Sequence, residues 1–168
     1  MRLIVLTGAS GSGKTTIARV IQARHADRVD ALFFDSIGVA SPNQMAAEFG
    51  SPEGWQRAKT IEWMTRIVTT SHLQRNVLFE GQMRLSFLIE AISAADLPDH
   101  HIILLDCDDV TRKRRLVDNR MQPELADSRM MDWARFLRDE ARRHQCEIVD
   151  TSFATIEASA ERIARHLI

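Results

Sequence analysis

A glycine-rich segment near the start of the chain holds the residues best suited to chemistry. Residues 8–15 read Gly-Ala-Ser-Gly-Ser-Gly-Lys-Thr. In such a pattern the glycines let the backbone wrap closely, so that N–H groups converge on phosphate oxygens. Lys14 can reach the β- and γ-phosphates of a nucleotide, and the Thr15 hydroxyl can be a ligand of Mg²⁺. We therefore expect ATP and Mg²⁺ to bind here, with Thr15 as the metal ligand, through Gly8, Ala9, Ser10, Gly11, Ser12, Gly13, Lys14, Thr15 and Thr16.

Acidic and basic side chains recur after later apolar runs. Asp35 ends the second such run, where the carboxyl end of a parallel strand would face a ligand. The alternative is an aspartate that only caps the loop. Residues 112–115 are Arg-Lys-Arg-Arg, and Arg120 follows. Such cations suit the negative charge of a transferring phosphoryl group. We expect Arg115, and then Arg120, to act there.

The elements that would position these residues alternate along the chain. Short apolar runs bounded by turns alternate with segments of helical period, which is typical of a parallel α/β sheet. The pattern predicts five strands, over 3–7, 31–35, 77–80, 101–106 and 147–150. It predicts helices over 14–25, 42–49, 52 to about 74, 110–120, 128–143 and 156–167. We find no repeat or linker, so the chain reads as a single domain over 1–168.

These motifs and their order resemble the nucleoside-monophosphate-kinase-like branch of P-loop proteins, which includes adenylate, shikimate and gluconate kinases and chloramphenicol phosphotransferase. The resemblance implies a three-layer α/β fold with a five-stranded parallel sheet in the order 2-3-1-4-5 and a small helical lid. The lid would span about 112–138, and helices for an acceptor about 36–74. By the same resemblance, Asp35 would contact the acceptor hydroxyl and accept its proton.

The segment Glu80-Gly81-Gln82-Met83-Arg84 is similar to the Asp-Gly-x-x-Arg motif after strand three in nucleotide kinases. The resemblance implies that Glu80 acts on the Mg²⁺ shell or the acceptor, and that Arg84 binds the acceptor. Gln82 could recognise a neutral polar group. The sequence departs from the family pattern, with Glu for Asp and Gln-Met for Phe-Pro. The alternative is a solvent-facing ion pair between Glu80 and Arg84.

Two further segments fit the resemblance less closely. Arg115-Leu116 followed by Arg120 resembles the lid-arginine pattern of the family, although its spacing is one residue longer than usual. We expect Arg112, Lys113 and Arg114 to form a solvated helix face, and we rank Arg135 and Arg138 lower as lid candidates. The run Asp150-Thr151-Ser152 is similar to a run in shikimate- and gluconate-kinase-like sequences, and marks the fold more than catalysis.

Composition narrows the remaining classes. The 22 basic and 23 acidic residues give a net charge of −1, unlike the basic excess of a dedicated nucleic-acid binder. No apolar run is long enough to span a bilayer, and the first residues do not form a signal peptide. We expect a cytoplasmic protein, monomeric or homodimeric, that contacts no membrane. Cys107 and Cys146 should be free thiols, and His72, His100 and His101 show no ligand spacing.

The sequence therefore predicts an ATP-dependent phosphotransferase that moves the γ-phosphoryl group to a hydroxyl of a small-molecule acceptor. One alternative is a nucleotide or nucleoside kinase, in which Arg84 binds an acceptor phosphate. Another is a P-loop ATPase that acts as a nucleotide-dependent switch. Trp55, Trp63 and Met64 could form a wall for the acceptor, although aromatic side chains at helical spacing more often belong to the core.

Overall fold

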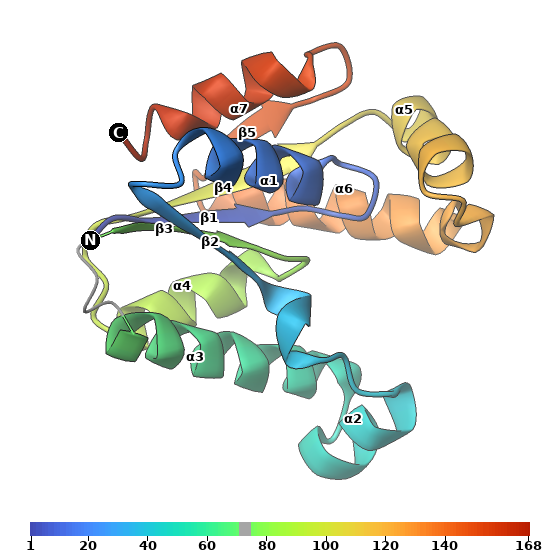
Figure 1. The fold of residues 1–168 in the computed structure, drawn as a ribbon. Coiled ribbons are helices and arrows are strands. Elements are labelled where there is room, and N and C mark those ends of the chain that lie inside the picture. Colours follow the sequence, from blue (N-terminus) through green and yellow to red (C-terminus); the bar gives the residue numbers. More distant parts are fainter. Residues whose placement is uncertain (71–74) are drawn as a thin grey trace.

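The computed structural model describes residues 1–70 and 75–168. Its centre is one parallel sheet in the order β2-β3-β1-β4-β5, which confirms the predicted order (Figure 1). The strands are β1 (Leu3–Thr7), β2 (Val29–Phe33), β3 (Asn76–Glu80), β4 (His100–Asp106) and β5 (Glu147–Asp150). The predicted helix end near residue 74 and His72 lie outside the described residues.

Helices cover both faces of the sheet, as a three-layer fold requires (Figure 1). The first face carries α1 (Lys14–Arg24) and α7 (Ile156–Ala164). The other carries α3 (Pro52–Thr70), α4 (Leu85–Ala94) and α6 (Ser128–Arg143), while α2 (Pro42–Phe49) packs against α3 away from the sheet. Between β4 and α6 run α5 (Asp109–Arg114), a π-helical turn η2 (Arg115–Asn119) and a short 3₁₀ helix η3 (Pro123–Leu125).

The core forms because each strand buries side chains on both faces. In β1, Leu3 and Val5 join the cluster under α3, α4 and α6, whereas Ile4 and Leu6 join the cluster under α1 and α7. A parallel strand covered on both faces is expected to be apolar throughout, and all five residues of β1 are buried. This strand leads directly into the glycine-rich loop, so the loop starts from the buried central strand of the sheet.

Apart from shifts of a single end, such as α7 ending at Ala164 rather than 167, three details differ from the predicted elements. β2 spans Val29–Phe33 rather than 31–35, and Asp35 lies in a 3₁₀ helix, η1 (Phe34–Ile37). α4 was not predicted, although parallel strands such as β3 and β4 need a crossover connection. The predicted helix over 110–120 divides into α5 and η2.

The aromatic side chains of α3 belong to the core rather than to a wall for an acceptor. Trp55, Trp63 and Met64 are all buried. The Trp63 indole donates a hydrogen bond of 3.2 Å to the Phe34 carbonyl oxygen, which ties α3 to the start of η1. Cys107 and Cys146 are free, as predicted. No helix of the described residues is both long and apolar enough to cross a bilayer.

Candidate nucleotide and acceptor site

The glycine-rich loop lies between β1 and α1 at the carboxyl edge of the sheet. Gly8 is required there, because a Cβ atom on it would lie 2.2 Å from the Leu105 carbonyl oxygen of β4. Gly13 has φ 95° and forms the N-cap of α1. Its left-handed conformation, which favours glycine, directs the loop into the helix. The loop therefore has the backbone course that phosphate binding at a helix N-terminus requires.

Lys14, the first residue of α1, is held under the loop. Its side chain is 8% exposed, and its Nζ donates to the Ala9 carbonyl oxygen over 3.2 Å. Burial lowers the pKa of Lys14 to about 8, and the positive charges of Arg112 and Arg120 act in the same direction. Glu80 and Asp35 oppose this shift. The lysine is thus a buried cation whose protonation an arriving anion would favour.

Thr15 and Glu80 form the part of the site suited to a hard cation. The Thr15 hydroxyl donates to Glu80 Oε1 over 3.0 Å, while Glu80 Oε2 is buried without a hydrogen-bond partner among the described residues. Burial raises the pKa of Glu80, and the negative charge of Asp35 adds to this effect. A hydroxyl next to a buried carboxylate oxygen fits the oxygen ligands that Mg²⁺ prefers. These residues therefore fit the Mg²⁺ expected with ATP.

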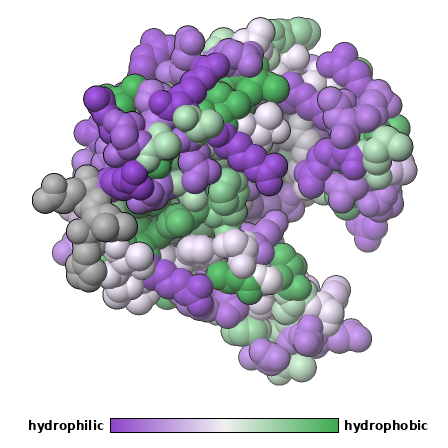
Figure 2. Space-filling view, viewed as in Figure 1, coloured by the Kyte–Doolittle hydropathy of each residue, from purple (hydrophilic) through white to green (hydrophobic). Residues whose placement is uncertain are grey.

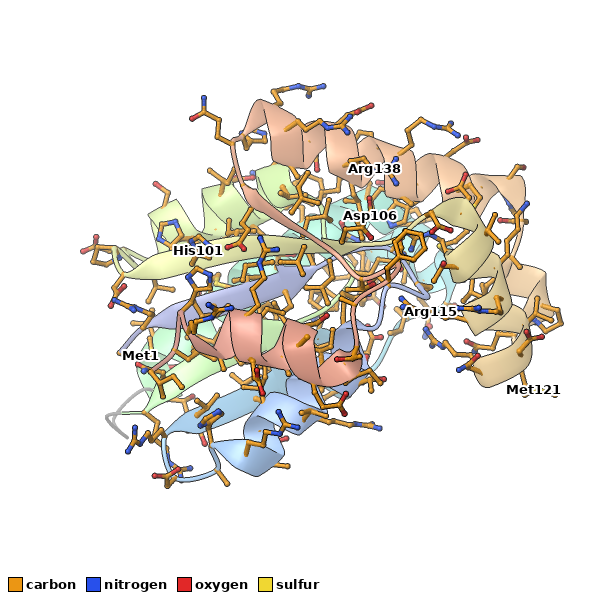
Figure 3. The ribbon with its side chains drawn as sticks, turned by 90° about the horizontal axis from the view of Figure 1, so that it is seen from above. Met1, His101, Asp106, Arg115, Met121 and Arg138 are labelled. Carbon is orange, nitrogen blue, oxygen red and sulfur yellow. The ribbon has the colours of Figure 1, made fainter. Side chains whose placement is uncertain are left out.

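Arg112 of α5 holds the glycine-rich loop in place through a hydrogen bond to its backbone. It is 0% exposed, so its predicted place on a solvated helix face is wrong, whereas Lys113 and Arg114 are exposed as predicted. Its guanidinium donates to the Ser10 carbonyl oxygen over 2.9 Å and to Asp106 Oδ1 over 2.6 Å. Asp106 also pairs with Arg138 of α6 (Figure 3). Arg138, ranked from sequence as a lower lid candidate, therefore has an ion-pair partner in the structure.

Arg115 and Thr151 close the wall between the loop and β5. Arg115 donates to the Thr151 hydroxyl over 2.9 Å, to the Thr151 carbonyl oxygen over 2.7 Å and to the Gly11 carbonyl oxygen over 3.3 Å. The buried Thr151 hydroxyl lies 3.0 Å from the Ser12 carbonyl oxygen. The sequence marked Thr151 only as a feature of the fold, but here it connects the loop to the last strand.

The longer spacing between Arg115 and Arg120 has a structural cause. The Arg120 N–H bonds the Arg115 carbonyl oxygen over 3.0 Å, an i to i+5 bond that defines the π-helical turn η2. Such a turn accommodates one extra residue and often occurs at functional sites. Both arginines consequently line the same pocket beside the loop, of about 470 Å³, together with Gly13, Thr16, Thr151 and Ile156.

The acceptor side contains the other predicted residues. Asp35 is exposed on η1, and its charge acts on both Lys14 and Glu80. The Ser10 hydroxyl donates to Gln82 Oε1 over 3.1 Å, so Gln82 lies against the loop. The structure therefore brings Asp35, Glu80 and Gln82 to the same edge of the sheet as Lys14.

Arg84 lies apart from Glu80, so these two residues do not form the ion pair considered from sequence. Its guanidinium is 2.8 Å from Glu53 Oε1 and 4.8 Å from the centroid of the Phe136 ring. Gln56, which carried no signal in the sequence, fixes this segment: its amide donates to the Gln82 carbonyl oxygen over 2.9 Å and accepts from the Arg84 N–H over 3.1 Å.

The two sides of the site are separated by an open hollow. Figure 2 shows the surface hollowed between the part of the molecule around α5 and the part around α2. Of the predicted lid, the stretch from α5 to η3 projects beside this hollow (Figure 1). By contrast, α6 buries Ala134 and Leu137 in the core. The acceptor side therefore faces the arginine side across solvent.

Comparison with known proteins supports the same architecture. A family model described as an AAA domain matches residues 4–150. No curated protein matches the chain in sequence. Shikimate kinase from Acinetobacter baumannii, solved in complex with shikimate, is similar in structure, with a TM-score of 0.65, 18% identity and coverage of 98% of this chain and 92% of that one.

Two further solved structures are similar over nearly the whole chain. A sugar kinase from Janibacter sp. HTCC2649 has a TM-score of 0.67 and 19% identity, covering 99% of this chain and 94% of that one. A gluconokinase from Sinorhizobium meliloti 1021 has a TM-score of 0.65 and 16% identity, covering 99% and 91%. These matches confirm the fold that the motifs led us to expect.

Proposed function

The chain belongs to the AAA domain family, and from this premise we propose that it is an ATP-dependent phosphotransferase acting on a hydroxyl of a small-molecule acceptor. The observation that carries the proposal is the meeting of the glycine-rich loop, Lys14 and the Thr15–Glu80 pair with Asp35 at one sheet edge. The kinases among the similar structures support the same reaction class. A cytoplasmic location and a monomeric or homodimeric state remain predictions.

Each residue has a definite task in this proposal. The loop N–H groups and Lys14 would hold the phosphates, and Thr15 with Glu80 would hold Mg²⁺, which neutralises charge on the phosphate oxygens when it is bound. Asp35 would orient the acceptor hydroxyl and take its proton as the new P–O bond forms and the bond to the ADP oxygen breaks. A carboxylate suits this task because the proton is lost late.

The two lid arginines would divide the work. Arg115 already donates to Gly11 and Thr151, so it mainly shapes the pocket wall. Arg120 is exposed on the same pocket, and its charge acts on both Lys14 and Glu80. We therefore propose that Arg120 chiefly stabilises the negative charge of the transferring phosphoryl group, and that Arg115 holds the pocket wall in place.

The charges on the acceptor side favour an acceptor that is neutral or cationic. Between residues 36 and 70 the chain has three Lys or Arg side chains, and each is paired with a glutamate: Arg57 with Glu90, and both Lys59 and Arg66 with Glu62. Arg84 is paired with Glu53. These carboxylates partly neutralise the cations of this segment, so it offers less positive charge to an anionic acceptor. A nucleotide kinase, which needs Arg84 for an acceptor phosphate, is therefore the less favoured alternative.

The test is ATP turnover with a panel of acceptors. Neutral polyols, amino alcohols and nucleosides should stimulate turnover more than sugar acids or nucleoside monophosphates. Stimulation by anionic acceptors alone, with a higher acceptor KM in Arg84→Ala, would favour the nucleotide or sugar-acid reading. Turnover that no acceptor stimulates would favour the switch.

A substitution of Asp35 tests the proposed base. Asp35→Asn should lower kcat by about 100-fold or more, which is the usual contribution of a general base, and should leave the KM for ATP unchanged. Asp27→Asn is the matched control, because Asp27 is an exposed aspartate whose nearest ion-pair partner is Arg28. If Asp35→Asn retains phosphoryl transfer within about tenfold of the parent, the assignment of this residue as the base is wrong.

A further inference from the structure

Three potential metal ligands converge at the end of the sheet farthest from the glycine-rich loop. His101 lies on β4, Glu147 is the first residue of β5, and His166 follows α7. Their ligand atoms all lie within 4.8 Å of one another. Glu147 Oε2 is 2.9 Å from His101 Nε2 and 3.0 Å from His166 Nε2. Two imidazole nitrogens therefore point at one carboxylate oxygen.

The surroundings of this cluster hold its atoms in place. Arg162 of α7 donates to the other carboxylate oxygen, Glu147 Oε1, over 3.0 Å from Nε and 2.8 Å from Nη2. The two imidazole rings are stacked, with centroids 4.2 Å apart and planes at 21°. Outer partners of this kind fix the orientation of ligands in metal sites. Arg162 thus leaves Oε2 as the single oxygen that faces both rings.

We propose that His101, Glu147 and His166 bind a first-row transition-metal dication, of which Zn²⁺ is the probe. Two imidazoles and a carboxylate suit such ions, and three protein ligands leave a fourth position for water. Zn–N bonds of about 2.0–2.1 Å place tetrahedral ligand atoms roughly 3.3 Å apart. Each nitrogen would have to move away from Glu147 Oε2 by a few tenths of an ångström. The two imidazole nitrogens, which lie at most 4.8 Å apart, would have to approach each other by up to about 1.5 Å. Each neutral ring would then carry its proton on Nδ1 and offer the Nε2 lone pair.

The proposed site is separate from the expected Mg²⁺ site in both place and chemistry. His101 precedes Asp106 by five residues along β4, which corresponds to about 17 Å. Figure 3 shows His101 near Met1 at one end of the sheet and Arg115 at the other. Mg²⁺ prefers oxygen ligands, whereas two imidazoles select a softer ion. A metal here would tie β4, β5 and the segment after α7 together.

Titration of the metal-free protein with Zn²⁺ tests the proposal. Competition with a chromophoric chelator should show one Zn²⁺ per chain with a micromolar or lower Kd. At free Zn²⁺ of about 100 times Kd, the Tm should rise by roughly 5–10 °C. Mg²⁺ at the same concentration should leave the Tm unchanged. Lys14→Met should bind Zn²⁺ like the parent, because the proposed site does not involve the nucleotide loop.

Variants decide whether these three residues are the ligands. His101→Ala, His166→Ala and Glu147→Gln should each weaken Zn²⁺ binding at least tenfold, while His144→Ala, which replaces an exposed histidine, should not. Circular dichroism and ATP binding without metal identify the variants that still fold. If a variant of His101 or Glu147 on a strand fails to fold, His166→Ala, in the segment after α7, still tests the site. Absence of micromolar Zn²⁺ binding, or equal binding by His166→Ala and His144→Ala, would overturn the proposal.

Discussion

In Lys14, the positive charge needed to bind phosphates is opposed by the burial of the side chain. Its side chain must be a cation to hold phosphates, yet it is buried, and the Ala9 carbonyl oxygen is the one hydrogen-bond partner of its Nζ among the described residues. Burial lowers its pKa from 10.5 to about 8, with Glu80 opposing the shift. Anionic phosphates beside Nζ would favour the protonated form and raise the pKa again. Nucleotide binding should therefore be coupled to proton uptake by one lysine.

This coupling predicts a specific pH dependence for ATP binding. Below pH 8 the free lysine is already protonated, so the Kd for ATP should change little on account of Lys14. Above pH 8 the free protein loses this proton while the bound form keeps it, so the Kd should rise by up to about tenfold per pH unit. Calorimetry in buffers of different ionisation enthalpy would measure the proton uptake. Lys14→Met should bind more weakly and take up no proton, and a Kd that is constant from pH 7.5 to 9.5 in the parent would contradict the mechanism.

At the scale of elements, the sequence predicted the bounds of those helices and strands that a local hydrophobic pattern determines. The strand over Leu3–Thr7, the strand over Glu147–Asp150 and the helix over Ser128–Arg143 were predicted with their observed bounds. They are apolar runs or strongly amphipathic segments with clear ends. By contrast, α4 was missed even though parallel strands require a crossover there.

Other features depended on contacts between distant parts of the chain. Arg112 lies in a run of basic residues, and nothing local separates it from Arg114. Its burial follows from Asp106 on β4 and from the loop carbonyl oxygen of Ser10. The convergence of His101 and His166 on Glu147 likewise arises from three elements that are remote in sequence. Spacing rules cannot detect such clusters, because the fold alone brings their members together.

The contrast between Arg112 and Arg114 gives a prediction for α5. Arg112→Ala should lower the free energy of unfolding by about 1.5–3 kcal/mol, because the buried Asp106 loses one of its two cationic hydrogen-bond partners and keeps Arg138. It should also weaken ATP binding, since the Ser10 carbonyl oxygen loses its donor. Arg114→Ala, on the exposed face, should change stability by less than about 0.5 kcal/mol. Urea unfolding and ATP titration of both variants provide the measurements; equal effects would mean that Arg112 does not brace the loop.

At the scale of the whole molecule, the site consists of two sides that face each other across the hollow in Figure 2. Asp35 belongs to the side of η1 and α3, while Arg120 belongs to the segment after α5, and both side chains are exposed. Phosphoryl transfer needs the reacting atoms about 3–3.5 Å apart and protected from water. Because Asp35 and Arg120 are both exposed beside this hollow, we expect the two sides to approach each other for the proposed reaction.

The molecule should therefore become more compact when both substrates bind. We expect the radius of gyration, measured by small-angle scattering, to fall when a non-hydrolysable ATP analogue with Mg²⁺ and a stimulating acceptor are added together. The analogue alone should cause a smaller decrease, because it contacts the loop and the arginine side but not η1. Lys14→Met provides the control: with weakened phosphate binding it should remain open at the same ligand concentrations. A radius of gyration that stays constant in the parent at saturation with both ligands would show that the two sides do not close. The proposal that Asp35 and Arg120 act together on one transferred phosphoryl group would then be contradicted.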